Sequence, residues 1–172
     1  FPYPTLFRSA LVAALIEVER HVGALGWDQP ARLFALVRTQ DLIAAEPHLA
    51  EALSAAQPDG FSSVEQDEFK AGADLAESLA GIMWPEAVSG CALSVERAFL
   101  PPDAEADLPE DPDRAADVVA AHPRRLDLRL VVGVTRDGQR HAVARVRDAE
   151  GELLGGPELV PALAEALAHT FE

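Results

Sequence analysis

The first part of the chain carries a clear helical pattern over residues 10–25. Apolar side chains recur there at steps of three and four residues, which places them on one stripe of a helix. Gly26 follows the stripe, and glycine readily takes the left-handed conformation that ends a helix. The stripe consists of Leu11, Leu15, Val18, Val22 and Leu25.

Further helices are predicted by apolar residues at helical spacing and by end signals. Pro47 must kink or divide one of these helices. Asp111 and Pro112 are typical of the N-cap and first position of another. Two overlapping capping boxes in residues 62–66 favour a short additional helix. The main predicted helices span residues 10–25, 40–55, 73–83, 112–121 and 157–171.

Strand patterns occupy four segments. Residues 32–38 are apolar on both sides, and residues 91–99 alternate between apolar and small or polar side chains. The other two segments flank Asp137-Gly138, which is typical of a hairpin turn. The predicted strands span residues 32–38, 91–99, 126–136 and 139–147.

The hairpin register follows from the apolar pattern. A three-residue loop over residues 136–138, with Gly138 left-handed, sets Leu130 opposite Ala144 and keeps the apolar residues together. A two-residue loop would set Leu130 against Arg145 and mix the two faces. Because a one-residue slip inverts a strand, we prefer the three-residue loop.

These elements predict an α+β fold. Four strands cannot bury an apolar face alone, so the stripes of the first, third and last main helices are expected to cover it. We therefore predict two layers, with a mainly antiparallel sheet of about four strands, in one domain over residues 10–172. Residues 1–9 are aromatic-rich and resemble translated sequencing-adapter sequence, so we treat them as a non-native or disordered leader. A processed terminus or a short β-arm is the alternative.

Charge and composition exclude several classes of protein. The 172 residues carry a net charge of −15, and this acidic balance opposes nucleic-acid binding, which needs a basic surface. No apolar run approaches the ~20 residues of a membrane-spanning helix. Cys91 has no partner cysteine, so an internal disulfide framework is excluded. We expect a cytoplasmic protein, and the sequence leaves its oligomeric state open.

Searches for catalytic patterns find no candidate. The five histidines are scattered without the spacing of metal ligands, and neither a nucleophile elbow nor a phosphate-binding glycine loop is present. Cys91 lies at the start of a predicted strand, where a small buried residue is expected, and no base can be named beside it. We therefore name no catalytic residue, metal or cofactor.

One electrostatic feature stands out. Residues 124–147 hold seven arginines and two aspartates, a local charge of +5, whereas residues 103–117 carry −6. In the preferred register Arg129 and Arg145 lie opposite each other and should repel unless an anion or carboxylate sits between them. This face either receives an acidic partner or small anion, or is neutralised by the protein's own acids.

Two tryptophans form the second candidate feature. Trp27 and Trp84 each lie at a predicted helix-to-strand junction beside a proline. Such residues either close the edge of a core or form an exposed binding lip. With the arginines, the candidate ligand- or partner-binding residues are Arg129, Arg145, Arg147, Trp27 and Trp84.

Several sequence blocks resemble a family of uncharacterised actinobacterial proteins. The most specific block is Gly-Trp-Asp-Gln-Pro at residues 26–30 with residues 32–39 after it. The resemblance covers roughly residues 10–171 and leaves residues 1–9 unmatched. It implies a small, single-domain cytoplasmic protein and carries no activity to transfer. The later matching blocks are residues 84–85, 90–93, 122–123 and 129–134.

Together these observations favour a non-catalytic protein-interaction or adaptor domain. Its outline, a small acidic α+β domain with an amphipathic terminal helix, is similar to secretion-chaperone-like adaptors. The alternative is a binder of a small anionic ligand, or an enzyme acting on one, at the arginine-lined sheet face.

Overall fold

The computed structural model describes most of the chain, and the account below is confined to those residues. Residues 1–9, the predicted leader, lie outside them, as does the first part of the acidic run. The described residues are 10–49, 51, 60–70, 75–100, 108–147, 153–156 and 160–171.

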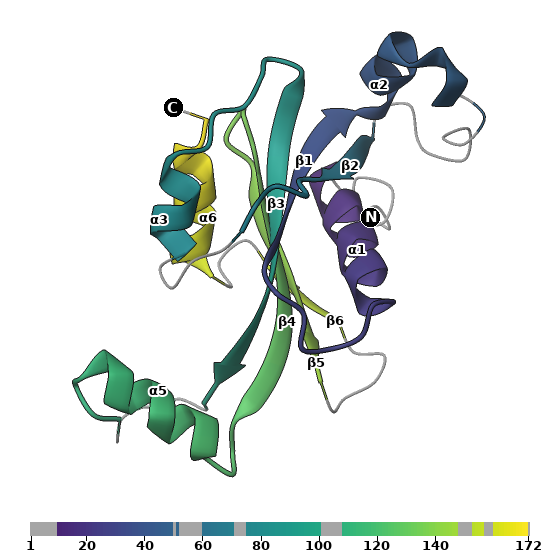
Figure 1. Cartoon of the computed structure of the whole chain (residues 1–172). Helices are drawn as coiled ribbons and strands as arrows, with labels where there is room; N and C mark the ends of the chain where they lie inside the picture. Colours follow the sequence, from purple (N-terminus) through teal and green to yellow (C-terminus); the bar gives the residue numbers. More distant parts are fainter. Residues whose placement is uncertain are drawn as a thin grey trace, which may run out of the picture.

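The fold is built on one open antiparallel sheet of six strands, in the order β2-β1-β3-β4-β5-β6 (Figure 1). The prediction of about four strands is therefore too low. All four predicted strands are present, and the strand over residues 32–38 has the predicted bounds. The strands are β1 Arg32–Arg38, β2 Phe61–Glu65, β3 Val88–Phe99, β4 Leu126–Thr135, β5 Arg140–Val146 and β6 Leu153–Gly156.

The two additional strands lie at the edges of the sheet. The helix expected over residues 62–66 is wrong, because this segment forms β2 and pairs with β1. Phe61 packs against the core beneath α1, and this anchoring outweighs the local capping boxes. Strand β6 is short and ends in two glycines, so it carries almost no periodic signal.

The hairpin has the predicted register. Leu130 pairs with Ala144 and Arg129 with Arg145. Residues 136–138 form the loop, and Gly138 has φ of +98°, a conformation that favours glycine. The three-residue loop is confirmed.

The predicted main helices are all present, but three end earlier than predicted: α1 at Gly23, α3 at Ala80 and α6 at His169. The helix over residues 112–121 has the predicted bounds, with Asp111 accepting from the Asp113 amide at 3.1 Å. Pro47 divides the second helix as expected, and Pro161 begins the last helix instead of lying inside it. Residues 50, 52–55, 73–74 and 157–159 of the predicted helices lie outside the described residues. The helices are α1 Ala10–Gly23, α2 Thr39–Ala45, the 3-10 turn Pro47–Leu49, α3 Leu75–Ala80, α5 Pro112–Ala121 and α6 Pro161–His169.

Helices cover both faces of the sheet, so the prediction of two layers is wrong. Figure 1 shows α1 on one side of the sheet, with α3 and α6 on the other. Strands β1, β3, β4 and β5 are apolar on both faces and supply two separate cores. The helices expected to cover the sheet, the first, third and last, do cover it. None of the described helices is long and apolar enough to span a bilayer.

Candidate functional site

Four of the five candidate residues come together at one end of the sheet face that α1 covers. The guanidinium carbon of Arg129 lies 4.3 Å from the ring centre of Trp27, and that of Arg147 lies 5.4 Å from it. Arg145 is the strand neighbour of Arg129. Trp84 is not part of this group, because it packs against the core on the opposite face, under α3 and α6. We call the four residues the Trp27 cluster.

A buried carboxylate joins the two facing arginines. Glu19 of α1 is 2% exposed, and its Oε1 lies 3.7 Å from Nη1 of Arg129 and accepts a hydrogen bond from Nε of Arg145. Arg129 is also 2% exposed. The carboxylate between Arg129 and Arg145 is therefore supplied by the protein itself, and it offsets the repulsion between them.

Arg129 and its neighbour on β3, Glu96, hold the turn that carries Trp27. Arg129 donates from Nη2 to the Gly26 carbonyl at 3.0 Å. Glu96, which pairs with Arg129 across β3 and β4, accepts from the amides of Asp28 and Gln29 at 3.0 and 2.8 Å. Asp28 has φ of +64°, so these bonds hold a backbone that few non-glycine residues adopt.

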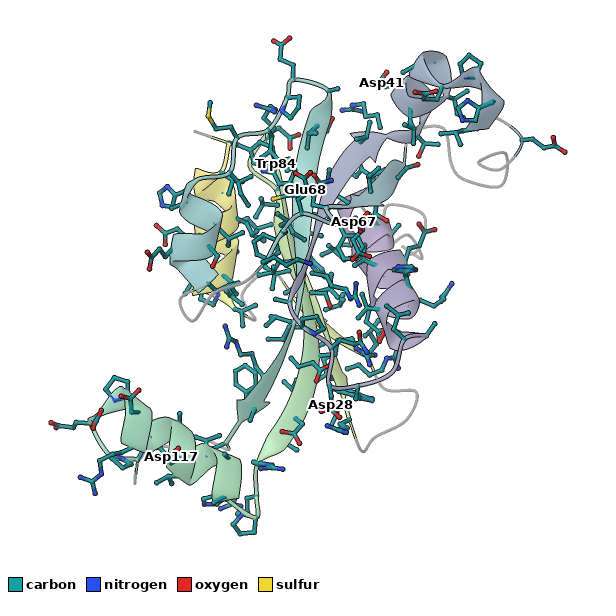
Figure 2. The ribbon with its side chains drawn as sticks, in the orientation of Figure 1. Asp28, Asp41, Asp67, Glu68, Trp84 and Asp117 are labelled. Carbon is teal, nitrogen blue, oxygen red and sulfur yellow. The ribbon has the colours of Figure 1, made fainter. Side chains whose placement is uncertain are left out.

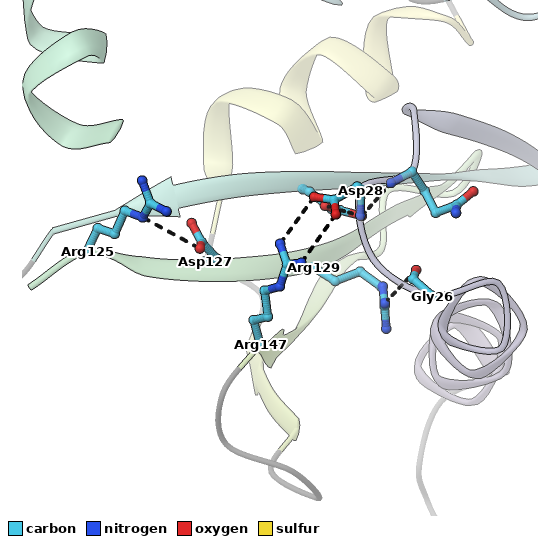
Figure 3. Close-up of polar contacts among 8 residues, drawn as sticks. Gly26, Asp28, Arg125, Asp127, Arg129 and Arg147 are labelled. Atoms are coloured by element: carbon cyan, nitrogen blue, oxygen red, sulfur yellow. Dashed lines mark hydrogen bonds and ion pairs between the residues drawn. The ribbon is translucent and has the colours of Figure 1, made fainter. Parts of the chain in front are cut away.

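The outer arginine of the Trp27 cluster is paired too. Both terminal nitrogens of Arg147 donate to the Asp28 carboxylate at 3.2 Å, as Figure 3 shows. These hydrogen bonds raise the pKa of the Arg147 guanidinium above its usual value. Oδ2 of Asp127 lies 3.6 Å from Nε of Arg125 at the same end of β4. Three of the seven local arginines, Arg129, Arg145 and Arg147, are thus met by acids from a distant part of the chain.

The ion pairs and hydrogen bonds around Trp27 have a chiefly structural role. They connect the turn after α1 to β3, β4 and β5, and they keep the Arg129 side chain out of contact with solvent. One polar atom there is unsatisfied, because Nε of Arg129 is buried without a hydrogen-bond partner among the described residues.

A groove with a different character lies at Trp84. It has a volume of about 440 Å³ and is lined by Phe69, Ile82, Met83 and Trp84, among others. Met83, the only methionine in the chain, is 89% exposed. We call this feature the Trp84 groove.

The floor of the Trp84 groove is fixed. The indole nitrogen of Trp84 donates to Oγ1 of Thr170 at 2.8 Å, and its ring stacks on Phe171 with centres 6.1 Å apart. Thr170 donates in turn to the Leu167 carbonyl. The tryptophan is therefore held by the two residues that follow α6.

One acid, Glu68, lines the Trp84 groove, and Figure 2 labels it beside Trp84. Asp67 lines a neighbouring hollow with Arg32 and Lys70. Glu86 lines another hollow with Arg38 and Arg136, and all three acids are exposed. Within the described residues none of the three forms an ion pair. Among the lining residues that the structure describes, Lys70 is the one cation.

The cysteine is enclosed in the core. Cys91 is 0% exposed, and burial raises the pKa of its thiol to about 12. A thiol in this state is protonated at neutral pH and is a poor nucleophile. The described residues also hold no group of three or more histidine, cysteine or acidic side chains that could bind a metal ion.

Sequence reasoning missed two residues, Glu19 beside the Trp27 cluster and Met83 in the Trp84 groove. Glu19 lies four residues after Leu15, on the apolar stripe of α1, and an acid at such a position signals a buried ion pair. Met83 gave no such signal, because its position in the predicted helix over residues 73–83 suggested burial. The helix ends at Ala80, so Met83 falls in the following segment and is exposed.

Comparison with known protein families gives a match over almost the whole chain. The model of the family described as PPA1309-like protein matches residues 11–172. No curated protein and no solved structure matches the chain. The match confirms kinship with an uncharacterised family over almost the whole span that the sequence blocks indicated.

Proposed function

The chain belongs to the PPA1309-like protein family, and we propose that it is a non-catalytic protein-interaction domain, an adaptor that binds its partner at the Trp84 groove. The observation that carries this proposal is the 89% exposure of Met83 beside a rigidly held tryptophan. An exposed methionine adapts its shape to a partner at low cost. An actinobacterial source and a cytoplasmic location belong to the same proposal and rest on the sequence resemblance.

The energetic argument favours this groove. Large apolar side chains at a groove lose contact with water when a partner covers them, and this burial favours the complex. Aromatic residues and methionine are enriched at protein interfaces. Because Trp84 is held in place by Thr170 and Phe171, little side-chain entropy is lost when a partner packs on it.

The alternative, an anionic ligand at the arginine-lined face, receives less support. An anion would have to displace Glu19 from Arg129 and Arg145, or Asp28 from Arg147. Displacing Glu19 would leave a carboxylate buried without its partners, which is costly.

Affinity capture from the source organism tests the proposal. The wild-type chain is compared with Met83→Asp, which places a charge at the exposed rim of the Trp84 groove. We expect a partner that the wild type retains and Met83→Asp loses. Val118→Asp is the matched control, because Val118 is an exposed apolar residue on α5, which Figure 1 shows well apart from α3.

The Val118→Asp control must retain the partner if the Trp84 groove is the binding site. Identical sets of captured proteins for the wild type and Met83→Asp would overturn the proposal. A thermal shift with an anionic metabolite that is lost in Arg145→Ala would favour the alternative instead.

A further inference from the structure

We infer that Met83 is a site of reversible oxidation, and that its conversion to the sulfoxide by a hydroperoxide releases the partner from the Trp84 groove. The inference rests on the proposed function and adds a means of regulating the same site. It is carried by two independent observations, the exposure of the Met83 thioether and the enclosure of the only other sulfur atom in the chain.

The two sulfur atoms of the chain belong to Met83 and Cys91, and they lie in opposite surroundings. Met83 is 89% exposed, whereas Cys91 is 0% exposed in the core that α6 covers. Burial also raises the pKa of the Cys91 thiol to about 12, so its reactive thiolate is scarce at neutral pH. A thioether reacts without first losing a proton, so its exposure governs the reaction. An oxidant that arrives from solvent therefore meets Met83 first.

The reaction balances with hydrogen peroxide as the oxidant. A lone pair on the Met83 sulfur attacks one peroxide oxygen, so that the sulfur–oxygen bond forms as the oxygen–oxygen bond breaks. The proton on the transferred oxygen passes to the departing hydroxide, which leaves as water. The sulfur is oxidised by two electrons and the peroxide is reduced by two. Methionine sulfoxide reductases reverse the change with two electrons from thiols.

The product changes the chemistry of the Trp84 groove where the partner packs. Oxidation converts an apolar side chain into a polar one, whose oxygen stays hydrated while it faces solvent. A partner that covers this oxygen beside Ile82 and Trp84 removes the water, which costs free energy unless a donor replaces it. Oxidation of Met83 therefore weakens the complex.

The fold itself does not depend on the Met83 side chain. Among the described residues, the two core clusters do not include Met83, and the Trp84 ring is held by Thr170 and Phe171. An apolar side chain that is already exposed loses little burial when it becomes polar. The oxidised chain should therefore keep its stability while it loses its partner, which distinguishes regulation from oxidative damage.

Treatment of the full wild-type chain with hydrogen peroxide tests this inference. Peptide mass mapping should place one added oxygen on Met83 before Cys91 is modified, and urea denaturation should give an unchanged free energy of unfolding. The oxidised chain should bind the partner captured by the untreated chain roughly tenfold more weakly. Reductases for both sulfoxide epimers should restore the binding. Because Met83 is the only methionine, this recovery assigns the effect to it.

Two substitutions separate the polarity of residue 83 from other effects of the oxidant. Met83→Gln places a polar amide at the groove without peroxide and should bind the partner about tenfold more weakly than the wild type. Val118→Gln places the same amide at an exposed apolar position on α5 and should bind as the wild type does.

The outcomes distinguish this inference from the proposed function. Oxidation of Cys91 before Met83, undiminished binding by the chain that carries the sulfoxide, or a loss that persists once the sulfoxide is reduced would overturn the inference and leave the Trp84 groove standing. If nothing is captured, or if Met83→Asp retains every protein that the wild type captures, the groove is not the binding site and both proposals fail.

Discussion

Glu19 of α1 and Arg129 of β4 lie 110 residues apart in sequence, yet their charged groups meet in the interior, each residue 2% exposed. Removing one partner of such a pair leaves the other charge buried and uncompensated. The contact therefore fixes α1 on the sheet. It also explains how two arginines can face each other across β4 and β5.

The first prediction concerns this carboxylate. Glu19→Gln should lower the free energy of unfolding by about 3–5 kcal/mol, because Arg129 and Arg145 then share a site without an anion. Urea denaturation of the purified chain measures the loss. Glu17→Gln, on the exposed side of the same helix, should change stability by less than about 0.5 kcal/mol. Equal effects of the two substitutions would show that the buried pair does not hold α1.

The second prediction concerns the stacking of Trp27. Trp27→Leu should cost about 1–2 kcal/mol of unfolding free energy, because it removes the ring over which Arg129 and Arg147 lie. Trp27→Phe keeps an aromatic face and should cost less. Chemical denaturation of both variants distinguishes them, and a phenylalanine variant no more stable than the leucine variant would argue against the cation–π contacts.

The third prediction concerns the close approach of α1 to β4. A Cβ at Gly133 would lie 2.5 Å from Cδ2 of Leu15 and 3.0 Å from Cδ1 of Leu11, both in the packed core. Gly133→Ala should therefore destabilise the fold by about 1–3 kcal/mol through overpacking.

Gly156 provides a matched comparison for Gly133. It is also a strand glycine, but a Cβ there meets nothing within 4 Å, so Gly156→Ala should be close to neutral in the same unfolding measurement. The double variant Gly133→Ala with Leu15→Ala should lose less than the sum of the two single losses. Simple additivity would mean that Gly133 does not serve the contact with Leu15.

The fourth prediction concerns the thiol of Cys91. Its pKa rises from 9.0 to about 12 on folding, so the folded state binds the proton more tightly than the unfolded state does. The contribution to stability is fully present below pH 9 and is lost as the pH rises toward 12.

The free energy of unfolding, measured across this alkaline range, tests the sign of the pH dependence. Compared with Cys91→Ala, the wild-type chain should lose stability more steeply above pH 9. At neutral pH a thiol reagent should react slowly with the folded chain and rapidly in urea. Rapid reaction of the folded chain would show that Cys91 is not enclosed as described.

Local sequence signals predicted the parts of the fold that depend on neighbouring residues. The bounds of β1 and α5 follow from an apolar run and from the Asp111-Pro112 cap, and the hairpin register follows from the face on which Leu130 must lie. The edge strands depend on partners far away. Residues 62–66 carry a good local helix signal, and only pairing with β1 makes Phe61–Glu65 a strand.

The candidate site was predicted only in part, because it too depends on residues that are distant in the sequence. The predicted register placed Arg129 opposite Arg145 and called for an anion or a carboxylate between them. That this group is Glu19 depended on how α1 lies across the sheet. Trp27 and Trp84 have similar local surroundings in the sequence, yet the structure places them on opposite faces. Sequence spacing carries no information on which face a junction residue takes when helices cover both.

The central claim is that a partner binds at the Trp84 groove, and amide hydrogen exchange of the full chain with and without the captured partner tests it most directly. We predict slower exchange in residues 66–70 and 82–84 on binding, with no change in the turn around Trp27. Slowing at Trp27 and Arg147 alone, or no slowing at all, would contradict the claim.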